Sequence, residues 1–227
     1  IIPVYNEDKT ILEILKKINL IKNIANFEVI VINDGSTDNT KKLIDENTRL
    51  YDLVKHLKHN KGKGEAVIEG LRISTKEYIF FQDADLEYDP KDLMRFIEIV
   101  NNYHADLVMG NRFSGKNRSV LLFWHMIGNK FISFFFNIFN NTTFSDIYCC
   151  YCLFQKRNLP INKLNSKGWG QHAEILTYLS NNSKKIFETS VNYDGRRYSE
   201  GKKIRYYHIF GVIYWIVFTK LKILLTK

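Results

Sequence analysis

The sequence is poor in the residues that mark disulfide-bonded, zinc-finger or disordered proteins. Three prolines and twelve glycines among 227 residues argue against long disordered linkers, and no repeat or low-complexity stretch occurs. The three cysteines, Cys149, Cys150 and Cys152, are crowded together, so neither a disulfide framework nor a zinc site of paired cysteines is expected. We predict reduced thiols on a buried strand.

The sequence also lacks an apolar run long enough to cross a bilayer, which takes roughly twenty residues. The apolar stretch 206–218 is followed by Lys220 and Lys222. Acidic residues are in the minority, because 33 Lys and Arg face 24 Asp and Glu and give a net charge of +9. This charge suits an anionic membrane surface or phosphorylated substrates. Nucleic acid ranks last as a partner, since no RNA-binding signature or zinc finger is present.

Apolar strands alternate with helical segments in the first half of the chain. The runs 27–32 and 77–82 predict buried strands, and apolar spacing or capping predicts helices over 10–21, 36–47 and about 66–74. Ile1 stands inside a further strand, so we expect a few residues to precede it. The alternation predicts one domain with a parallel sheet flanked by helices, whose ligands bind beyond the carboxyl ends of the strands.

Polar clusters follow three of these strands, at 5–7, 33–36 and 83–85, and we expect all three to face one crevice. Asp83 and Asp85 lie one residue apart after an apolar strand, so both carboxylates can reach one cation. Mg²⁺ or Mn²⁺ prefers carboxylate, water and phosphate oxygens. A metal at Asp83 and Asp85 would therefore hold the diphosphate of a nucleotide and stabilise the departing group, with Glu87 as a further candidate ligand.

The loop Lys61-Gly62-Lys63-Gly64 precedes a predicted helix and offers backbone N–H groups and ammonium groups to an anion. Its spacing is not that of a Walker A motif, which disfavours a P-loop kinase.

Four segments resemble one known family in order and spacing. They are PVYNE (3–7), VINDGSTDNT (31–40), NKGKGEAVIEGL (60–71) and FFQDADLEYDP (81–90). They look like the nucleotide-diphospho-sugar glycosyltransferases of the GT-A fold, in particular the inverting family that includes dolichyl- and polyprenyl-phosphate mannosyl- and glucosyltransferases. The resemblance implies an α/β GT-A fold, Rossmann-like with a mostly parallel sheet flanked by helices, over residues 1–203. An amphipathic, interfacial C-terminal helix is expected over 204–227.

The resemblance also implies a role for each matching residue. At the donor it implies that Pro3, Tyr5 and Glu7 border the nucleoside, that Asp34 contacts the base or ribose, that Lys63 lies near the nucleotide, and that Asp83 and Asp85 take the metal and diphosphate. For the acceptor phosphate it implies Arg112, with Arg118 as a second basic residue. Arg196, Arg197 and Lys202 would close over the donor diphosphate.

The acceptor half departs from the family pattern. Residues 146–152 read D-I-Y-C-C-Y-C and residues 168–174 read G-W-G-Q-H-A-E, where the family tends to read D-M-E-T-C-Y-K and G-F-G-F-E-P-E. A phosphate acceptor is mostly dianionic at neutral pH and needs no general base, and Asp146 would then orient Arg112. A hydroxyl acceptor needs a base, for which Asp146 is the first candidate and Glu174 the second.

We therefore predict a metal-dependent, inverting hexosyltransferase that uses GDP- or UDP-hexose, Mg²⁺ or Mn²⁺, and a polyprenyl phosphate of the dolichyl or undecaprenyl type. Trp215, three tyrosines and flanking lysines suit a helix lying on the cytoplasmic face of a membrane. The alternative is a helix packed on the core or at a homodimer interface. Other functions stay open: transfer to a polysaccharide, glycolipid or protein hydroxyl, a degenerate nucleotide-sugar-binding protein, and a nucleotidyltransferase, which is disfavoured because its N-terminal loop is missing.

Overall fold

The computed structural model describes residues 1–22, 24–115, 122–195 and 208–226. The strands are β1 (Ile2–Val4), β2 (Ile30–Asn33), β3 (Leu53–His56), β4 (Tyr78–Phe80), β5 (Leu107–Asn111), β6 (Cys152–Gln155) and β7 (Ile186–Ser190). The α-helices are α1 (Ile11–Lys22), α2 (Thr40–Asp45), α3 (Lys63–Ile73), α4 (Leu93–Tyr103), α5 (Phe123–Asn140), α6 (Gln171–Asn182) and α7 (His208–Leu225). Short 3-10 turns cover Thr48–Leu50, Pro90–Asp92, Lys156–Asn158 and Ile161–Lys163.

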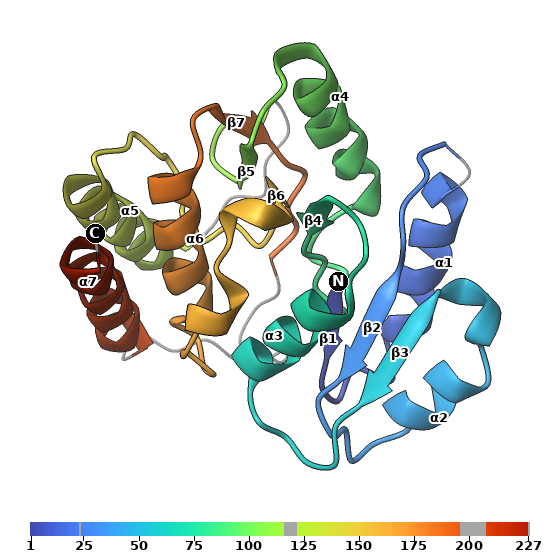
Figure 1. Cartoon of the computed structure of the whole chain (residues 1–227). Helices are drawn as coiled ribbons and strands as arrows, with labels where there is room; N and C mark the ends of the chain where they lie inside the picture. Colours follow the sequence, from blue (N-terminus) through green and yellow to red (C-terminus); the bar gives the residue numbers. More distant parts are fainter. Residues whose placement is uncertain (23, 116–121, 196–207, 227) are drawn as a thin grey trace.

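The strands form two sheets that meet at β1 and β4 (Figure 1). β1, β2 and β3 pair in parallel, in that order. The second sheet has the order β4-β6-β5-β7, with β6 antiparallel to both of its neighbours and β5 parallel to β7. The backbone N–H of Gln82 donates to the carbonyl oxygen of Ile1 at 3.0 Å and joins the sheets. The predicted α/β fold with a largely parallel sheet is confirmed.

Helices cover both faces of the first sheet because strand side chains alternate between faces. Val31 packs with the buried residues of α1, whereas Ile30 and Ile32 pack with Ala66 of α3 on the other face. In α1 the buried residues Ile11, Ile14, Leu15 and Ile18 follow helical spacing. This arrangement leaves the carboxyl ends of β1, β2 and β4 open for a site.

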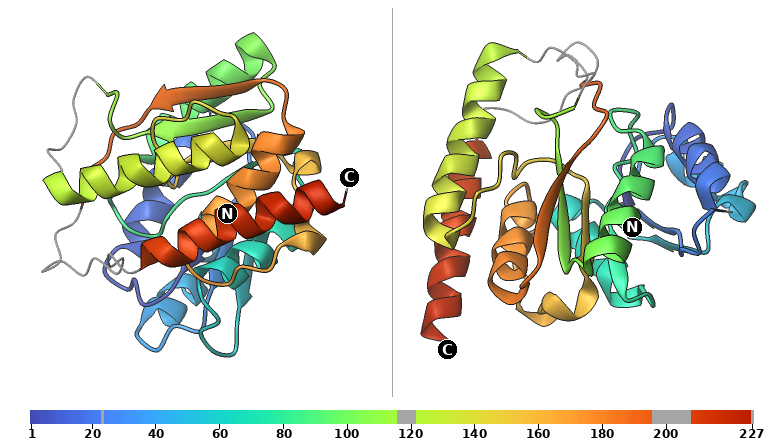
Figure 2. Two further views of the ribbon diagram at one scale, coloured as in Figure 1. Left: turned by 90° about the vertical axis from the view of Figure 1, so that its left-hand side faces the viewer. Right: turned by 90° about the horizontal axis from the view of Figure 1, so that it is seen from above.

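The expected C-terminal helix is present as α7, beginning at His208. It packs against α5 and α6, and Figure 2 shows α5 and α7 side by side on the outside of the second half. Val212, Ile216 and Ile223 of α7 are buried in the main core. The helix is therefore docked on the fold. The expected domain boundary at 203/204 lies outside the described residues and stays a prediction. No helix among the described residues combines the length and apolarity needed to span a membrane.

Candidate active site

One cavity gathers the predicted donor residues. Its volume is about 560 Å³, and its lining includes eight residues expected from the sequence: Pro3, Tyr5, Glu7, Asp34, Lys63, Asp83, Asp85 and Arg112. Pro3 lies within β1, and the other residues come from the segments that follow β1, β2, β4 and β5 and from the start of α3. The polar strand ends therefore share one crevice, as the sequence predicts.

The glycine loop before α3 is fixed by Asp34 and by the facing loop. The carboxylate of Asp34 accepts from the backbone N–H groups of Lys61 (2.8 Å) and Gly62 (2.9 Å). Burial raises the pKa of Asp34, and these two hydrogen bonds oppose the rise. Asp34 is only 2% exposed. Because its carboxylate accepts these two hydrogen bonds, it anchors the loop. The contact of Asp34 with a base or ribose stays a prediction.

Close packing explains the glycines of this loop. Gly62 has a φ of +95°, a region that non-glycine residues avoid. A Cβ on Gly64 would lie 2.3 Å from the carbonyl oxygen of Ser166, and the N–H of Gly64 donates to the carbonyl oxygen of Lys167 at 2.9 Å. The loop at 166–167 thus holds the glycine loop at the edge of the cavity.

In the acidic triplet Asp83-Ala84-Asp85, which follows β4, Asp83 forms an ion pair with Lys63. The ammonium of Lys63 donates to Oδ1 of Asp83 at 2.5 Å. Burial acts to raise the pKa of Asp83, but the charge and hydrogen bond of Lys63 outweigh it and lower the pKa. Among the residues that the structure describes, no three His, Cys, Asp or Glu side chains form a metal-binding group. Asp83 and Asp85 nevertheless line the same cavity, and two carboxylates with water and phosphate oxygens suit Mg²⁺ or Mn²⁺.

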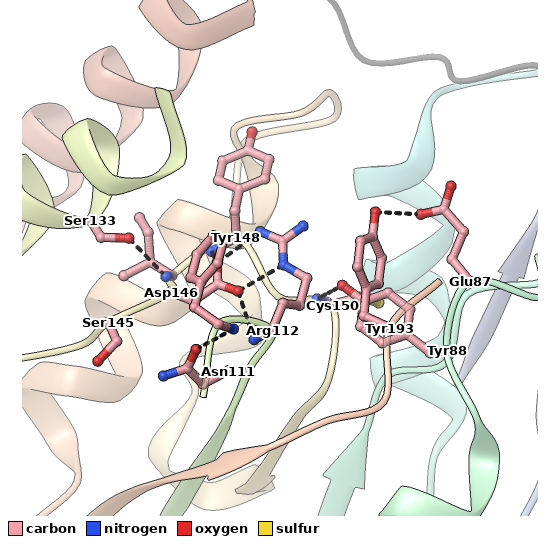
Figure 3. A network of polar contacts seen from close by, with 12 residues as sticks. Glu87, Tyr88, Asn111, Arg112, Ser133, Ser145, Asp146, Tyr148, Cys150 and Tyr193 are labelled. Atoms are coloured by element: carbon pink, nitrogen blue, oxygen red, sulfur yellow. Dashed lines mark hydrogen bonds and ion pairs between the residues drawn. The ribbon is translucent and has the colours of Figure 1, made fainter. Parts of the chain in front are cut away.

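Arg112 and Asp146 form a buried bidentate ion pair (Figure 3). Nε of Arg112 donates to Oδ2 of Asp146 at 2.7 Å and Nη2 donates to Oδ1 at 2.7 Å. The backbone N–H of Arg112 also donates to Oδ2 at 3.1 Å. Asp146 is fully buried, and Arg112 lines the cavity. Asp146 therefore orients the guanidinium, and its oxygens are engaged in doing so.

Tyrosines connect Arg112 with the acidic segment. The guanidinium lies 5.2 Å from the ring centroid of Tyr193, within cation–π range. The Tyr193 hydroxyl donates to Oε2 of Glu87 at 2.9 Å, as the dashed line in Figure 3 marks. The backbones of Tyr88 and Tyr193 form an isolated antiparallel β-bridge. Residues far apart in sequence thus link the expected acceptor arginine to the end of the acidic segment.

Tyr88, Tyr193 and His172 are among the lining residues of this cavity to which sequence reasoning gave no role. Tyr193 lies three residues before Arg196, to which the resemblance assigns a role, and that nearness was a usable signal. His172 lies in the segment that departs from the family pattern. Burial, and then the charge of Lys63, lower the pKa of His172 to about 4, so its imidazole is neutral at neutral pH. Four other predicted residues, Arg118, Arg196, Arg197 and Lys202, lie outside the described residues.

Comparison with known proteins decides the family. Residues 1–159 match the model described as Glycosyl transferase family 2. The chain belongs to glycosyltransferase family 2. Within curated proteins, this family 2 chain is 31% identical over 119 residues to an uncharacterized protein of Methanocaldococcus jannaschii, covering 49% of the chain and 50% of that protein. It is 32% identical over 115 residues to the dolichol-phosphate mannosyltransferase of Pyrococcus furiosus, covering 50% of the chain and 32% of that enzyme. The chain spans half or less of the length of these relatives.

Solved structures share the fold of the family 2 chain. Glucosyl-3-phosphoglycerate synthase from Mycobacterium tuberculosis, solved with Mn²⁺, UDP and phosphoglyceric acid, has a TM-score of 0.69 at 16% identity and covers 97% of this chain and 76% of its own. TarS of S. aureus, solved with UDP-GlcNAc, has a TM-score of 0.61 at 18% identity, with coverages of 96% and 64%. At these identities the likeness concerns the fold alone, and it confirms the predicted GT-A fold.

Proposed function

We propose that this family 2 chain transfers a hexose from GDP- or UDP-hexose to a polyprenyl phosphate, with inversion and with the help of Mg²⁺ or Mn²⁺. The observation that carries the proposal is the buried guanidinium of Arg112, held by Asp146 at the wall of the cavity that also contains the acidic triplet. The name of the Pyrococcus furiosus relative supports the acceptor class. The Mn²⁺ and UDP in the Mycobacterium tuberculosis structure support the donor and the cation.

The donor half of the cavity suits a nucleoside diphosphate. Lys63 is the first residue of α3, so an ammonium group and the N-terminal amides of a helix are available to a diphosphate. Asp83 and Asp85 would hold the divalent cation, which when bound neutralises charge on the departing nucleoside diphosphate. Glu87 would stay beside them, hydrogen-bonded to Tyr193.

The acceptor half suits a group that arrives already ionised. Neither candidate base lines the cavity. Asp146 is engaged by Arg112, and Glu174 accepts from the backbone N–H groups of Asn165 and Ser166 at 2.8–3.1 Å. A dianionic phosphate needs cationic positioning and no proton removal. One of its oxygens would bond to the anomeric carbon as the bond from that carbon to the diphosphate oxygen breaks, which inverts the configuration.

The outer surface of α5 and α7 supports a lipid-borne acceptor at a membrane. Many large apolar side chains of these two neighbouring helices are exposed, including Phe123, Phe131, Phe134, Ile138, Phe210, Tyr214, Leu221 and Leu224. Trp124 of α5 is 78% exposed and also lines the cavity. Trp124 thus belongs both to the cavity wall and to the exposed surface of α5, which lies beside α7 (Figure 2). Exposed apolar surface of this extent marks an interaction site. We infer peripheral binding to the cytoplasmic face of an anionic membrane, and pairing with a second copy is the alternative.

A hydroxyl acceptor is the second candidate function, and His172 favours it. Its imidazole lines the cavity and is neutral at neutral pH, so it has a nitrogen able to accept a proton. Its lowered pKa makes it a weak base, because general bases work best with a pKa near the operating pH. The phosphate acceptor is therefore preferred.

The test is a transfer assay with Mn²⁺ or Mg²⁺, a panel of labelled nucleotide sugars and polyprenyl phosphate. Label in an organic-extractable product that mild acid releases, with the inverted anomeric configuration, is the expected result. Label in a water-soluble or acid-stable product would favour the hydroxyl acceptor, and nucleotide binding without turnover would indicate a degenerate binding protein. Asp85→Asn should abolish metal-dependent transfer and leave the melting temperature unchanged. Transfer near the wild-type rate in this variant would defeat the metal assignment.

A further inference from the structure

The ion pair between Lys63 and Asp83 engages a carboxylate that the proposed cation site would use. Nζ of Lys63 contacts Oδ1 of Asp83, and the side chain of Asp83 also interacts with the thiol of Cys150. The side chains of Lys63 and Asp83 are 37% and 21% exposed, so both remain reachable from the cavity. An ammonium group and a divalent cation cannot share one carboxylate without strong mutual repulsion.

The surroundings let Lys63 leave Asp83 without moving the backbone. The preceding loop is pinned by Asp34 at Lys61 and Gly62, and by the hydrogen bond from Gly64 to Lys167. The ammonium itself stands on a flexible four-carbon stem. Only the side chain must swing, and a diphosphate at the N-terminus of α3 would give the ammonium a new anionic partner nearby.

We propose that Lys63 is a counter-ion switch that makes cation binding depend on the donor. In the donor-free protein its ammonium stands in for the divalent cation at Asp83. The donor diphosphate draws the ammonium away, which frees the carboxylate for Mg²⁺ or Mn²⁺. This inference rests on the proposed donor and cation site and adds the order in which it fills.

The inference predicts coupled binding of cation and nucleotide. Wild-type protein should bind Mn²⁺ weakly alone and far more tightly with UDP or GDP, and by linkage the nucleotide should gain from Mn²⁺ by the same factor. Lys63→Met should bind Mn²⁺ alone about tenfold more tightly than wild type, within the usual range of coupling between sites. The gain on adding nucleotide should shrink in this variant, because the carboxylate is already open.

Free Mn²⁺ is measured by electron paramagnetic resonance during titration of the full chain, without and with nucleotide. Lys167→Met is the matched control, since Lys167 lies on the loop facing Gly64 but pairs with Glu65 at 3.6 Å. It should stay within about twofold of wild type. Lys63→Gln serves as a second variant, and circular dichroism checks that each variant is folded.

The outcomes separate the switch from the proposed function. If Lys63→Met and Lys63→Gln both bind Mn²⁺ alone no better than wild type, while wild type binds it with nucleotide, the switch is wrong and the cation site stands. If wild type binds no Mn²⁺ with either nucleotide, the proposed cation site fails and the switch fails with it. If Lys167→Met gains as much as Lys63→Met, the effect is one of general charge, and the switch is again overturned.

Discussion

Replacing Asp146 by asparagine tests the assignment of the buried pair with Arg112. Asp146 is fully buried and receives three N–H groups of Arg112. Asparagine keeps one acceptor oxygen but turns an NH₂ group toward the guanidinium, and it leaves a positive charge buried without its counter-charge. Breaking a buried ion pair by removing one partner costs about 3–5 kcal/mol.

The expected loss of unfolding free energy corresponds to a fall in melting temperature. For a chain of this size, 1 kcal/mol corresponds to roughly 2–4 °C, so Asp146→Asn should melt about 6–20 °C below wild type. The assay is thermal unfolding followed by circular dichroism or calorimetry at one pH. Arg112→Met should be similarly harmful, whereas Arg112→Met combined with Asp146→Leu should recover much of the loss, because apolar replacement of a whole buried pair is often neutral.

A surface pair supplies the control. Glu13 and Lys17 are about half exposed on α1, so Glu13→Gln should cost less than about 1 kcal/mol. Asp146→Asn melting within about 2 °C of wild type would refute the account of this pair. If the folded variant also kept full transfer to polyprenyl phosphate but lost transfer to an alcohol, Asp146 would be a base and not a positioning residue.

Three further predictions use other features of the site. Gly64→Ala should weaken nucleotide binding at least about tenfold in a titration, because the added Cβ would lie 2.3 Å from a backbone carbonyl oxygen. A Cβ added at Gly211 would have no atom within 4 Å, so the Gly211→Ala variant should bind nucleotide as wild type does. The free energy of unfolding should fall by about 3 kcal/mol as the pH drops from about 6.5 to 4, because the lowered pKa of His172 lets the unfolded chain bind the proton before the folded one does. In His172→Phe, thermal melts across this range should show that much less dependence of stability on pH. An unchanged pH dependence would contradict the prediction. Trp124→Ser should reduce flotation with anionic vesicles severalfold, whereas Leu20→Ser on the distant α1, at 70% exposure, should not; equal flotation of both would argue against membrane contact through α5.

The gathering of the proposed donor residues around one cavity was predictable because parallel strands impose this geometry. The clusters follow the carboxyl ends of β1 and β2 in one sheet and of β4 where the second sheet adjoins it. Asp83 and Asp85 were proposed as metal ligands from their place after an apolar strand. The pairing of Lys63 with Asp83 was not predicted. It depends on the angle at which α3 leaves its loop, and no sequence spacing encodes that angle.

The acceptor half was less predictable because its backbone is irregular. The three cysteines were expected on a buried strand, but only Cys152 lies on one, because β6 covers just Cys152–Gln155. Before Cys152, backbone N–H groups donate to side chains and not to a neighbouring strand. That of Ile147 donates to the hydroxyl of Ser133 at 3.1 Å, and that of Cys150 donates to the hydroxyl of Tyr88 at 3.2 Å. Such local hydrogen bonds compete with a strand ladder. The resulting loop buries Asp146 under Arg112, and the sequence left open whether Asp146 was a base or an orienting residue.

Lys63 and Arg112, the lysine and the arginine that line the cavity within the described part of the chain, differ in a way that fits their proposed partners. The planar guanidinium of Arg112 is fixed through two of its nitrogens by a buried carboxylate. Its remaining N–H groups therefore point in fixed directions, and it binds a phosphate in one place only. Lys63 is a point charge on a flexible stem, paired with a single oxygen of Asp83, so it can change partners when a diphosphate arrives. A rigid acceptor side and an adjustable donor side would let the donor and its cation assemble first. The acceptor phosphate would then meet a guanidinium already aimed into the cavity.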